Sequence, residues 1–190
     1  MYKLIIFLHR KIRILVYQIL SNNTTTSNLK RIQPVQLLGA GDINIIGKVT
    51  IGYFPSPHFF STYAYLEARG KNSFIEIGDN TIINNGFVAI ADKTSITIGE
   101  NCLIGTQVEI YDSDFHALNA KNRKEENIYH PSPVKIGNNV FIGSNVRILK
   151  GVSIGDNCVI ANNSVVTKDI PCSCIAGGIP AVVINQINLS

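Results

Sequence analysis

The sequence of 190 residues contains no tryptophan, and its only methionine is residue 1. The core therefore cannot draw on either side chain and depends on β-branched residues, above all 30 isoleucines. Twenty asparagines supply residues that favour turns. Charged residues are also scarce, at 16% against 45% hydrophobic residues, which excludes a wholly disordered chain. The composition favours a β architecture with many corners.

Long apolar runs are missing too. The run Leu4–Leu8 stops at the basic segment His9–Arg13, which leaves no hydrophobic region of the length that a secretory signal needs. No stretch is long enough to span a bilayer. Cys172 and Cys174, two of the four cysteines, form neither a C-x-x-C pair nor part of a histidine cluster, which argues against zinc and redox sites. We therefore expect reduced thiols, no metal and a cytoplasmic protein.

Acidic residues are absent before Asp42, whereas the 149 residues that follow Gly41 carry 11 basic and 13 acidic ones. The main body is therefore not predicted to bind nucleic acid, and attraction to an anionic partner belongs mainly to the N-terminal arm. The arm contains six basic residues, namely Lys3, Arg10, Lys11, Arg13, Lys30 and Arg31.

Residues 1–30 are expected to form an amphipathic helix followed by a polar linker. Ile6 and Tyr17 fall on its more polar side. We expect the helix to dock on its own domain or on a sister subunit, or to adsorb to an anionic membrane, which would place the protein at the inner face of that membrane. Its apolar side carries seven residues at the helical period, namely Leu4, Ile5, Leu8, Ile12, Leu15, Val16 and Ile19.

A six-residue repeat dominates the rest of the chain. Six hexads run without interruption from Ile136 to Pro171, and isoleucine holds the first place in nine of the ten hexads that we identify. The second to fourth places hold Gly and Asn, which tolerate the backbone angles of a tight corner. Since strand side chains alternate, the first and fifth residues, such as Cys102 and Cys158, are expected inside, and the sixth outside. The earlier hexads start at Ile77, Ile83, Ile98 and Ile104.

This pattern resembles the hexapeptide-repeat acyltransferases, in particular their galactoside, maltose and polysaccharide O-acetyltransferase branch. The resemblance covers about residues 41–184 and implies an all-β fold, a left-handed parallel β-helix with three hexads per turn. We therefore expect the β-helix domain at residues 31–184, a protruding loop at 111–135 and a tail at 185–190.

The same resemblance implies a homotrimer. At 18 residues per turn, the outward residues Phe141 and Val159 share one side of the β-helix. An apolar outward pair indicates burial against another subunit.

The hexads stop after Ile110, and the next one starts 26 residues later, which is eight more than one turn requires. The extra segment contains the sequence Tyr-Asp-Ser-Asp-Phe-His, and the resemblance implies that His116 is the catalytic base. A sugar hydroxyl is a poor nucleophile until a base such as neutral imidazole removes its proton. Asp112 or Asp114 is expected to orient the imidazole or to contact the substrate, and loop capping is the alternative for each.

The resemblance also implies positions for the two substrates. Asn85 is the candidate to bind the acceptor, with a corner residue as the alternative. The acetyl-CoA groove would be lined by Ser144, Asn162, Thr167 and Lys168. The chain departs from the family at Ala161–Ser164, where Gly-Ala-Gly-Ser is common, and at Val182, where a cation is common, so the nucleotide end of the groove differs from the family pattern.

The function that the resemblance implies is acetyl-CoA-dependent O-acetylation of a sugar hydroxyl in a bacterial-type surface glycan or its precursor. Two alternatives stay open. The same fold supports N-acetylation of an amino-sugar nucleotide, and a β-helix also serves as a non-catalytic scaffold. His116 argues against the scaffold, which needs no base in this loop.

Overall fold

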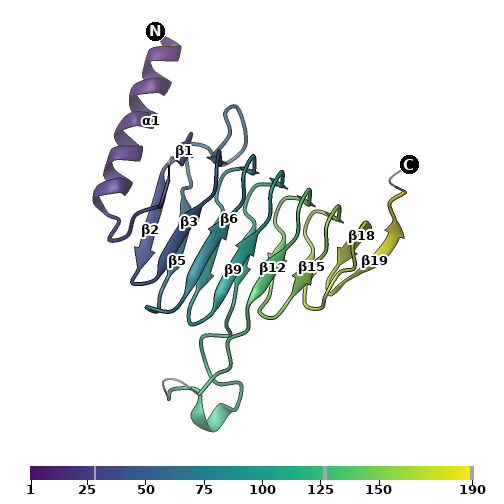
Figure 1. Cartoon of the computed structure of the whole chain (residues 1–190). Helices are drawn as coiled ribbons and strands as arrows, with labels where there is room; N and C mark the ends of the chain where they lie inside the picture. Colours follow the sequence, from purple (N-terminus) through teal and green to yellow (C-terminus); the bar gives the residue numbers. More distant parts are fainter. Residues whose placement is uncertain (28, 126–127, 189–190) are drawn as a thin grey trace.

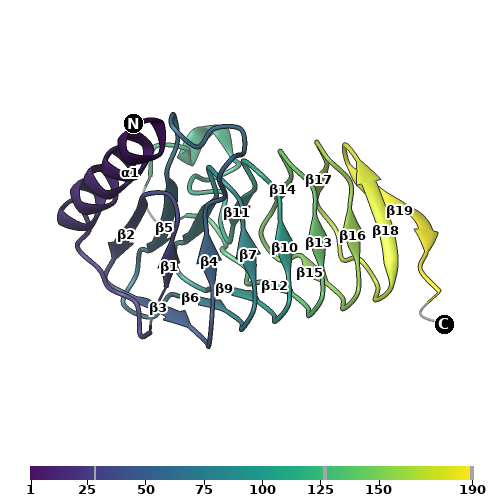
Figure 2. The same cartoon turned by 90° about the horizontal axis from the view of Figure 1, so that it is seen from above.

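The computed structural model describes residues 1–27, 29–125 and 128–188. The chain winds through three sheets in turn, so that each round of three strands makes one coil of a prism (Figures 1 and 2). We call the sheets the first, second and third face in the order in which the chain enters them. Residues 28, 126–127 and 189–190, which belong to the predicted linker, loop and tail, lie outside the described part.

Every face is parallel except for one antiparallel pair at the C-terminal end, β18 with β19. The first face contains β1 (Lys30–Arg31), β4 (Thr50–Ile51), β7 (Ile82–Ile83), β10 (Leu103–Ile104), β13 (Phe141–Ile142), β16 (Val159–Ile160), β18 (Cys174–Gly178) and β19 (Ala181–Gln186). The second contains β2 (Val35–Gly39), β5 (Ala64–Ala68), β8 (Val88–Ala91), β11 (Glu109–Tyr111), β14 (Arg147–Ile148) and β17 (Val165–Val166). The third contains β3 (Asp42–Ile45), β6 (Phe74–Ile77), β9 (Ser95–Ile98), β12 (Val134–Ile136) and β15 (Ser153–Ile154).

The hexad register is confirmed inside the prism. Ile142 and Ile148 are 0% exposed and Ile154 is 2% exposed. The fifth residues are buried as well, including the polar Thr81 and Ser164, whose hydroxyls donate to the carbonyls of Gly99 and Ala161 at 2.9 and 2.6 Å. A core of stacked aliphatic rows therefore holds the coils together.

Most of the corners owe their shape to the fourth residue of the hexad. Six asparagines at this place have φ between 54° and 59°, in the left-handed region that Asn and Gly tolerate best. Gly86 and Gly151 take the same place in two other hexads, with φ of 76°. Six of the asparagines thus serve to shape the backbone at the corners. The six asparagines are Asn80, Asn101, Asn139, Asn145, Asn157 and Asn163.

The outward residues align as the repeat predicts. Phe141 pairs in register with Val159 on the first face, and Arg147 pairs with Val165 on the second. On the first face the apolar column is longer than predicted, because Ile82, Leu103, Phe141, Val159 and Ile175 pair in sequence along it.

Helix α1 (Tyr2–Ile19) lies across the N-terminal end of the prism, beyond β2 (Figures 1 and 2). It docks through the side that the sequence marks as more polar: Tyr17 stacks on Tyr63 at 4.4 Å, and Arg13 donates to the carbonyls of Phe59 and Thr62 at 3.0 and 2.7 Å. No residue of α1 is buried, and the apolar stripe points outward. Within the described residues, no helix is long and apolar enough to cross a bilayer.

The segment after α1, predicted as a linker, is hydrogen-bonded to the prism. The amides of Asn22 and Asn23 donate to the carbonyl of Leu37, and the amide of Thr26 donates to that of Ile43. The segment therefore covers the open edges of β2 and β3.

Candidate active site

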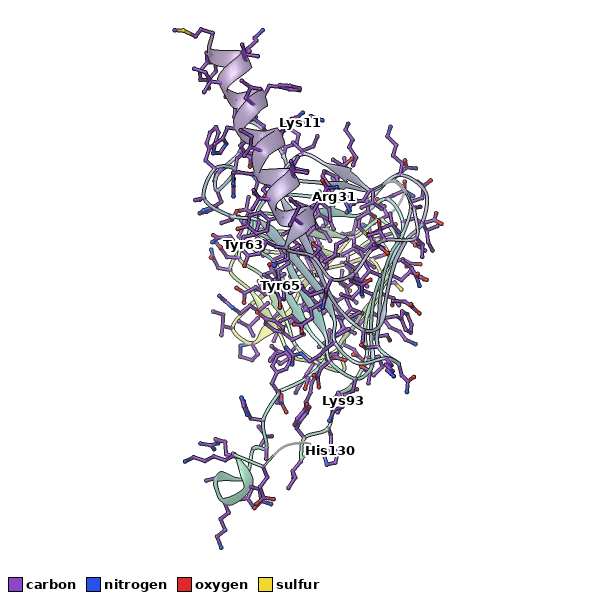
Figure 3. All side chains as sticks on the ribbon, turned by 90° about the vertical axis from the view of Figure 1, so that its left-hand side faces the viewer. Lys11, Arg31, Tyr63, Tyr65, Lys93 and His130 are labelled. Carbon is purple, nitrogen blue, oxygen red and sulfur yellow. The ribbon has the colours of Figure 1, made fainter. Side chains whose placement is uncertain are left out.

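The polar residues of interest gather along two edges of the prism. We call the edge between the first and second faces the first corner, and the edge between the second and third faces the second corner. The 3-10 helix η1 (Ala120–Asn122) belongs to the segment that leaves the second corner after β11 and returns at β12 (Figure 1). Figure 3 shows Lys93 and His130 where this segment leaves the prism, on the other side of the molecule from Lys11.

Asp112 is the structural anchor of this segment. Its carboxylate is 0% exposed and accepts the backbone N–H groups of Asp92 and Thr94, both at 2.8 Å. It also accepts the hydroxyl of Thr94 at 2.8 Å and the more distant N–H of Lys93 at 3.3 Å. On the return of the chain, the N–H of Ser132 donates to the carbonyl of Asp112 at 2.8 Å. Asp112 thus ties the start of the loop to the corner of the preceding coil.

Asp114 makes a different contact. Its carboxylate forms an ion pair of 2.5 Å with Lys150, which follows β14 at the same corner. The Lys150 ammonium also donates to the carbonyl of His130 at 2.8 Å. Both charged side chains are partly exposed, so the pair contributes less than about 1 kcal/mol to stability and mainly fixes the path of the loop.

His116 is exposed and makes no hydrogen bond to another residue in the described part of the chain. Neither Asp112 nor Asp114 holds its imidazole in this protomer, because both carboxylates are engaged elsewhere. Phe115, the residue before it, has φ of 60° and packs its ring under the Arg69 guanidinium, 5.1 Å away. The two aspartates therefore set the position of the loop, and the imidazole is left open to solvent.

A charged cluster beside this loop was missed by the sequence analysis. Asp92 is 3% exposed and accepts from Arg69 at 3.0 Å and from the Tyr129 hydroxyl at 2.7 Å. Arg69 also pairs with Glu67 at 3.0 Å, and hydrogen bonding to Glu67 raises the pKa of the Arg69 guanidinium. Burial and the bond to Asp92 raise the pKa of Tyr129 to about 12, so its hydroxyl stays protonated. The sequence feature that could have indicated this cluster is Asp92, a carboxylate directly after a strand.

Asn85 lies at the first corner and is 0% exposed. Its amide oxygen accepts the N–H of Tyr53 at 3.1 Å, and its amide nitrogen donates to the carbonyls of Tyr53 and Pro57 at 3.0 and 2.9 Å. Asn85 therefore holds the loop between β4 and β5. Asn85 could therefore influence binding of the acceptor only through the position of that loop.

The four residues expected to line the coenzyme groove fall into two pairs. At the first corner, the N–H of Ser144 donates to the side chain of Asn162 at 2.7 Å. The close approach needs Gly143, where a Cβ would lie 2.3 Å from the Asn162 amide oxygen. Thr167 and Lys168 are exposed at the second corner, two coils after the strand that precedes His116, or about 10 Å along the prism. One protomer thus carries the two pairs on different corners.

The comparisons with known proteins agree with this architecture. A family model described as the hexapeptide repeat of succinyl-transferase matches residues 95–110 and 133–168. The galactoside O-acetyltransferase of Escherichia coli K12 is 42% identical over 130 residues, which is 63% of each chain, so this chain spans less than two thirds of that enzyme. A putative acetyltransferase of Saccharomyces cerevisiae, YJL218W, is 38% identical over 143 residues, 75% of this chain and 67% of that one.

A solved structure of a galactoside acetyltransferase in complex with coenzyme A is 38% identical, with a TM-score of 0.59, and the match covers 76% of this chain and 65% of that one. The chain therefore belongs to the hexapeptide-repeat acyltransferases. The parallel coils and the single N-terminal helix fit the left-handed β-helix of that family.

Replacing Asp112 tests its role as the anchor of the loop. Asp112→Ala leaves the buried N–H of Asp92 and the partly buried N–H of Thr94 without an acceptor, so we expect the free energy of unfolding to fall by about 3 kcal/mol. Asp112→Asn keeps one acceptor oxygen and should lose about half as much. The matched control Asp114→Ala removes a partly exposed ion pair and should cost less than about 1 kcal/mol. Urea unfolding curves measure all three, and equal losses for Asp112→Ala and Asp114→Ala would contradict the anchor role.

Proposed function

We propose that the protein is an acetyl-CoA-dependent O-acetyltransferase that acts on a sugar hydroxyl of a surface glycan or its precursor. The observation that carries the proposal is the exposed His116 at the same corner as Thr167 and Lys168. Membership of the acyltransferase family and the similarity to galactoside enzymes support both the acetyl donor and the sugar acceptor.

In this mechanism His116 is the general base. Its neutral imidazole takes the proton of the sugar hydroxyl while the oxygen attacks the thioester carbonyl. The new ester C–O bond forms, the C–S bond breaks, and the imidazolium returns the proton to the departing thiolate. Asp112 and Asp114 contribute by holding the loop that carries His116, through the β8–β9 corner and through Lys150.

The coenzyme groove is proposed to lie between two protomers of a homotrimer. The separation of the two pairs supports this, because Ser144 and Asn162 line one corner while Thr167 and Lys168 line another. In a ring with cyclic symmetry, the first corner of one protomer can face the second corner of the next. Lys168 would then meet a phosphate of the coenzyme, and the exposed apolar column on the first face would be covered. The cytoplasm, where acetyl-CoA is made, is the proposed location.

Measuring thiol release from acetyl-CoA against a panel of acceptors tests the proposal. We expect release with galactosides or other oligosaccharides, and a product that gains one acetyl group as a base-labile ester. Transfer only to an amino-sugar nucleotide, giving a base-stable amide, would replace O-acetylation by N-acetylation. A folded protein that neither binds nor cleaves acetyl-CoA would favour the scaffold instead.

A further inference from the structure

The side of α1 that faces away from the protein is an apolar stripe. Seven residues on it are between 45% and 73% exposed, namely Leu4, Ile5, Leu8, Ile12, Leu15, Val16 and Ile19. The opposite side is occupied by the contacts of Arg13 and Tyr17 with the β4–β5 loop. The helix therefore docks on the protein through its less apolar side and leaves the apolar side exposed. An amphipathic helix normally buries its apolar side, so an exposed apolar patch of this kind indicates a site of interaction.

The surroundings of the stripe are cationic and aromatic. Lys11 lies at one margin of the stripe, with its ammonium 5.7 Å from the ring centroid of Phe7 one turn earlier. On the other margin His9 packs on Phe60, which is 52% exposed. No acidic residue precedes Asp42 in the sequence. The charge of this end of the molecule thus complements an anionic partner.

A hollow lies on the docked side of α1, opposite the stripe. A cavity of about 350 Å³ lies between the helix and the β4–β5 loop. It is lined by Tyr2, Lys3, Ile6, Phe7, Arg10, Phe54 and Phe59. Because the hollow faces the β4–β5 loop, it is not part of the surface that the stripe presents, and the proposal below does not depend on it.

The position of α1 decides between a second copy and a lipid surface. The helix lies beyond the N-terminal end of the prism and projects past it, and Figure 3 looks at the molecule from that end with α1 in front. A neighbour that associates through the column of Phe141 lies beside the prism and not beyond its end. The stripe therefore stays open in the proposed trimer, and three copies of it lie at one end of the assembly.

We propose that the apolar stripe of α1 lies on an anionic lipid surface, to which the charges of Lys3 and Lys11 attract the helix. This inference depends on the proposed function in one respect, namely that the protein is a homotrimer. Amphipathic helices of this type bind in the plane of the interface, with a strength set by apolar area and by attraction to anionic lipids. The trimer strengthens binding, because three weak contacts act together.

Sedimentation with vesicles tests the proposal on the full chain. We expect binding to vesicles of phosphatidylcholine with phosphatidylglycerol, much weaker binding to phosphatidylcholine alone, and a decline as salt rises. The double variant Leu8→Gln/Ile12→Gln should lose affinity for the anionic vesicles by about tenfold or more. Its matched control is Ile184→Gln, which changes an isoleucine that is 64% exposed at the other end of the prism and should bind like the unaltered protein. Lys3→Gln/Lys11→Gln should lose most of the salt dependence.

Three outcomes would overturn the proposal. The first is that the unaltered protein does not sediment with the anionic vesicles, and the second is that Ile184→Gln loses as much binding as the stripe variant. The third is that the stripe joins two copies of the chain, which a lower mass of the stripe variant in light scattering without vesicles would show. Since no residue of α1 is buried, the variants should keep their melting temperature. Acetyl transfer to a soluble acceptor is measured on the same samples, so failure of catalysis and failure of lipid binding are read separately.

Discussion

His116→Ala should lower the turnover number for acetyl transfer by about a hundredfold or more, while the affinity for coenzyme A stays unchanged. The alanine removes the imidazole that takes the hydroxyl proton. It leaves the Asp112 and Asp114 contacts in place, so the loop keeps its path. Steady-state thiol release gives the turnover number, and calorimetry gives the affinity for coenzyme A.

His130→Ala is the matched control for this experiment. His130 lies on the same loop, but its contact with Lys150 is made by the backbone carbonyl, which alanine retains. We expect turnover close to that of the unaltered protein and an equal melting temperature for both variants. Full activity in folded His116→Ala, or an equal loss in His130→Ala, would contradict the assignment of the base.

Phe141→Glu should dissociate the proposed trimer into protomers. Phe141 is 49% exposed in the single chain and stands in the middle of the apolar column on the first face. The carboxylate is harmless in the isolated protomer. In the assembly it would be buried without a partner, at a cost of several kcal/mol per site. Light scattering coupled to size exclusion gives the mass of both proteins.

Lys135→Glu is the control for the trimer experiment. Lys135 occupies an outward place on the third face, where it pairs with Ser153, and it is exposed. This variant introduces the same carboxylate, with a net charge change of two units instead of one, and should keep the mass of the unaltered protein. A monomeric unaltered protein, or a Phe141→Glu variant of unchanged mass, would contradict the interface. Loss of the trimer should also lower acetyl transfer, because the two halves of the coenzyme groove separate.

The repeat made the prism predictable from the sequence. A period of six places every first residue inside, and 18 residues per turn bring Phe141 beside Val159, so burial and register both follow from counting. The contacts of the site did not follow. Asp92 meets Arg69 and Tyr129 only because a loop outside the repeat returns over the corner, and nothing in the spacing of these residues encodes that path.

The docking of α1 shows a second limit of pattern reading. A helical wheel tells which side of α1 is apolar, but not which side meets the protein. Arg13 decides the matter, because its guanidinium finds two backbone carbonyls in the β4–β5 loop. For Asn85 the sequence indicated a special position and left two explanations open; its three backbone partners give it a supporting place under that loop.

The hydrogen bonds of residues 21–26 have a consequence for how the chain stays a discrete particle. A stack of parallel coils has no natural last coil, and an uncovered strand at its end is a template onto which another molecule can add. Ser21, Asn22 and Asn23 occupy the outer side of β2 at Leu37, and Thr26 does the same for β3. At the opposite end the antiparallel β19 ends the parallel pairing of the first face. The short polar segment from which α1 extends thus covers two of the three strand edges at the N-terminal end, and we expect it to hinder end-to-end addition of another molecule there.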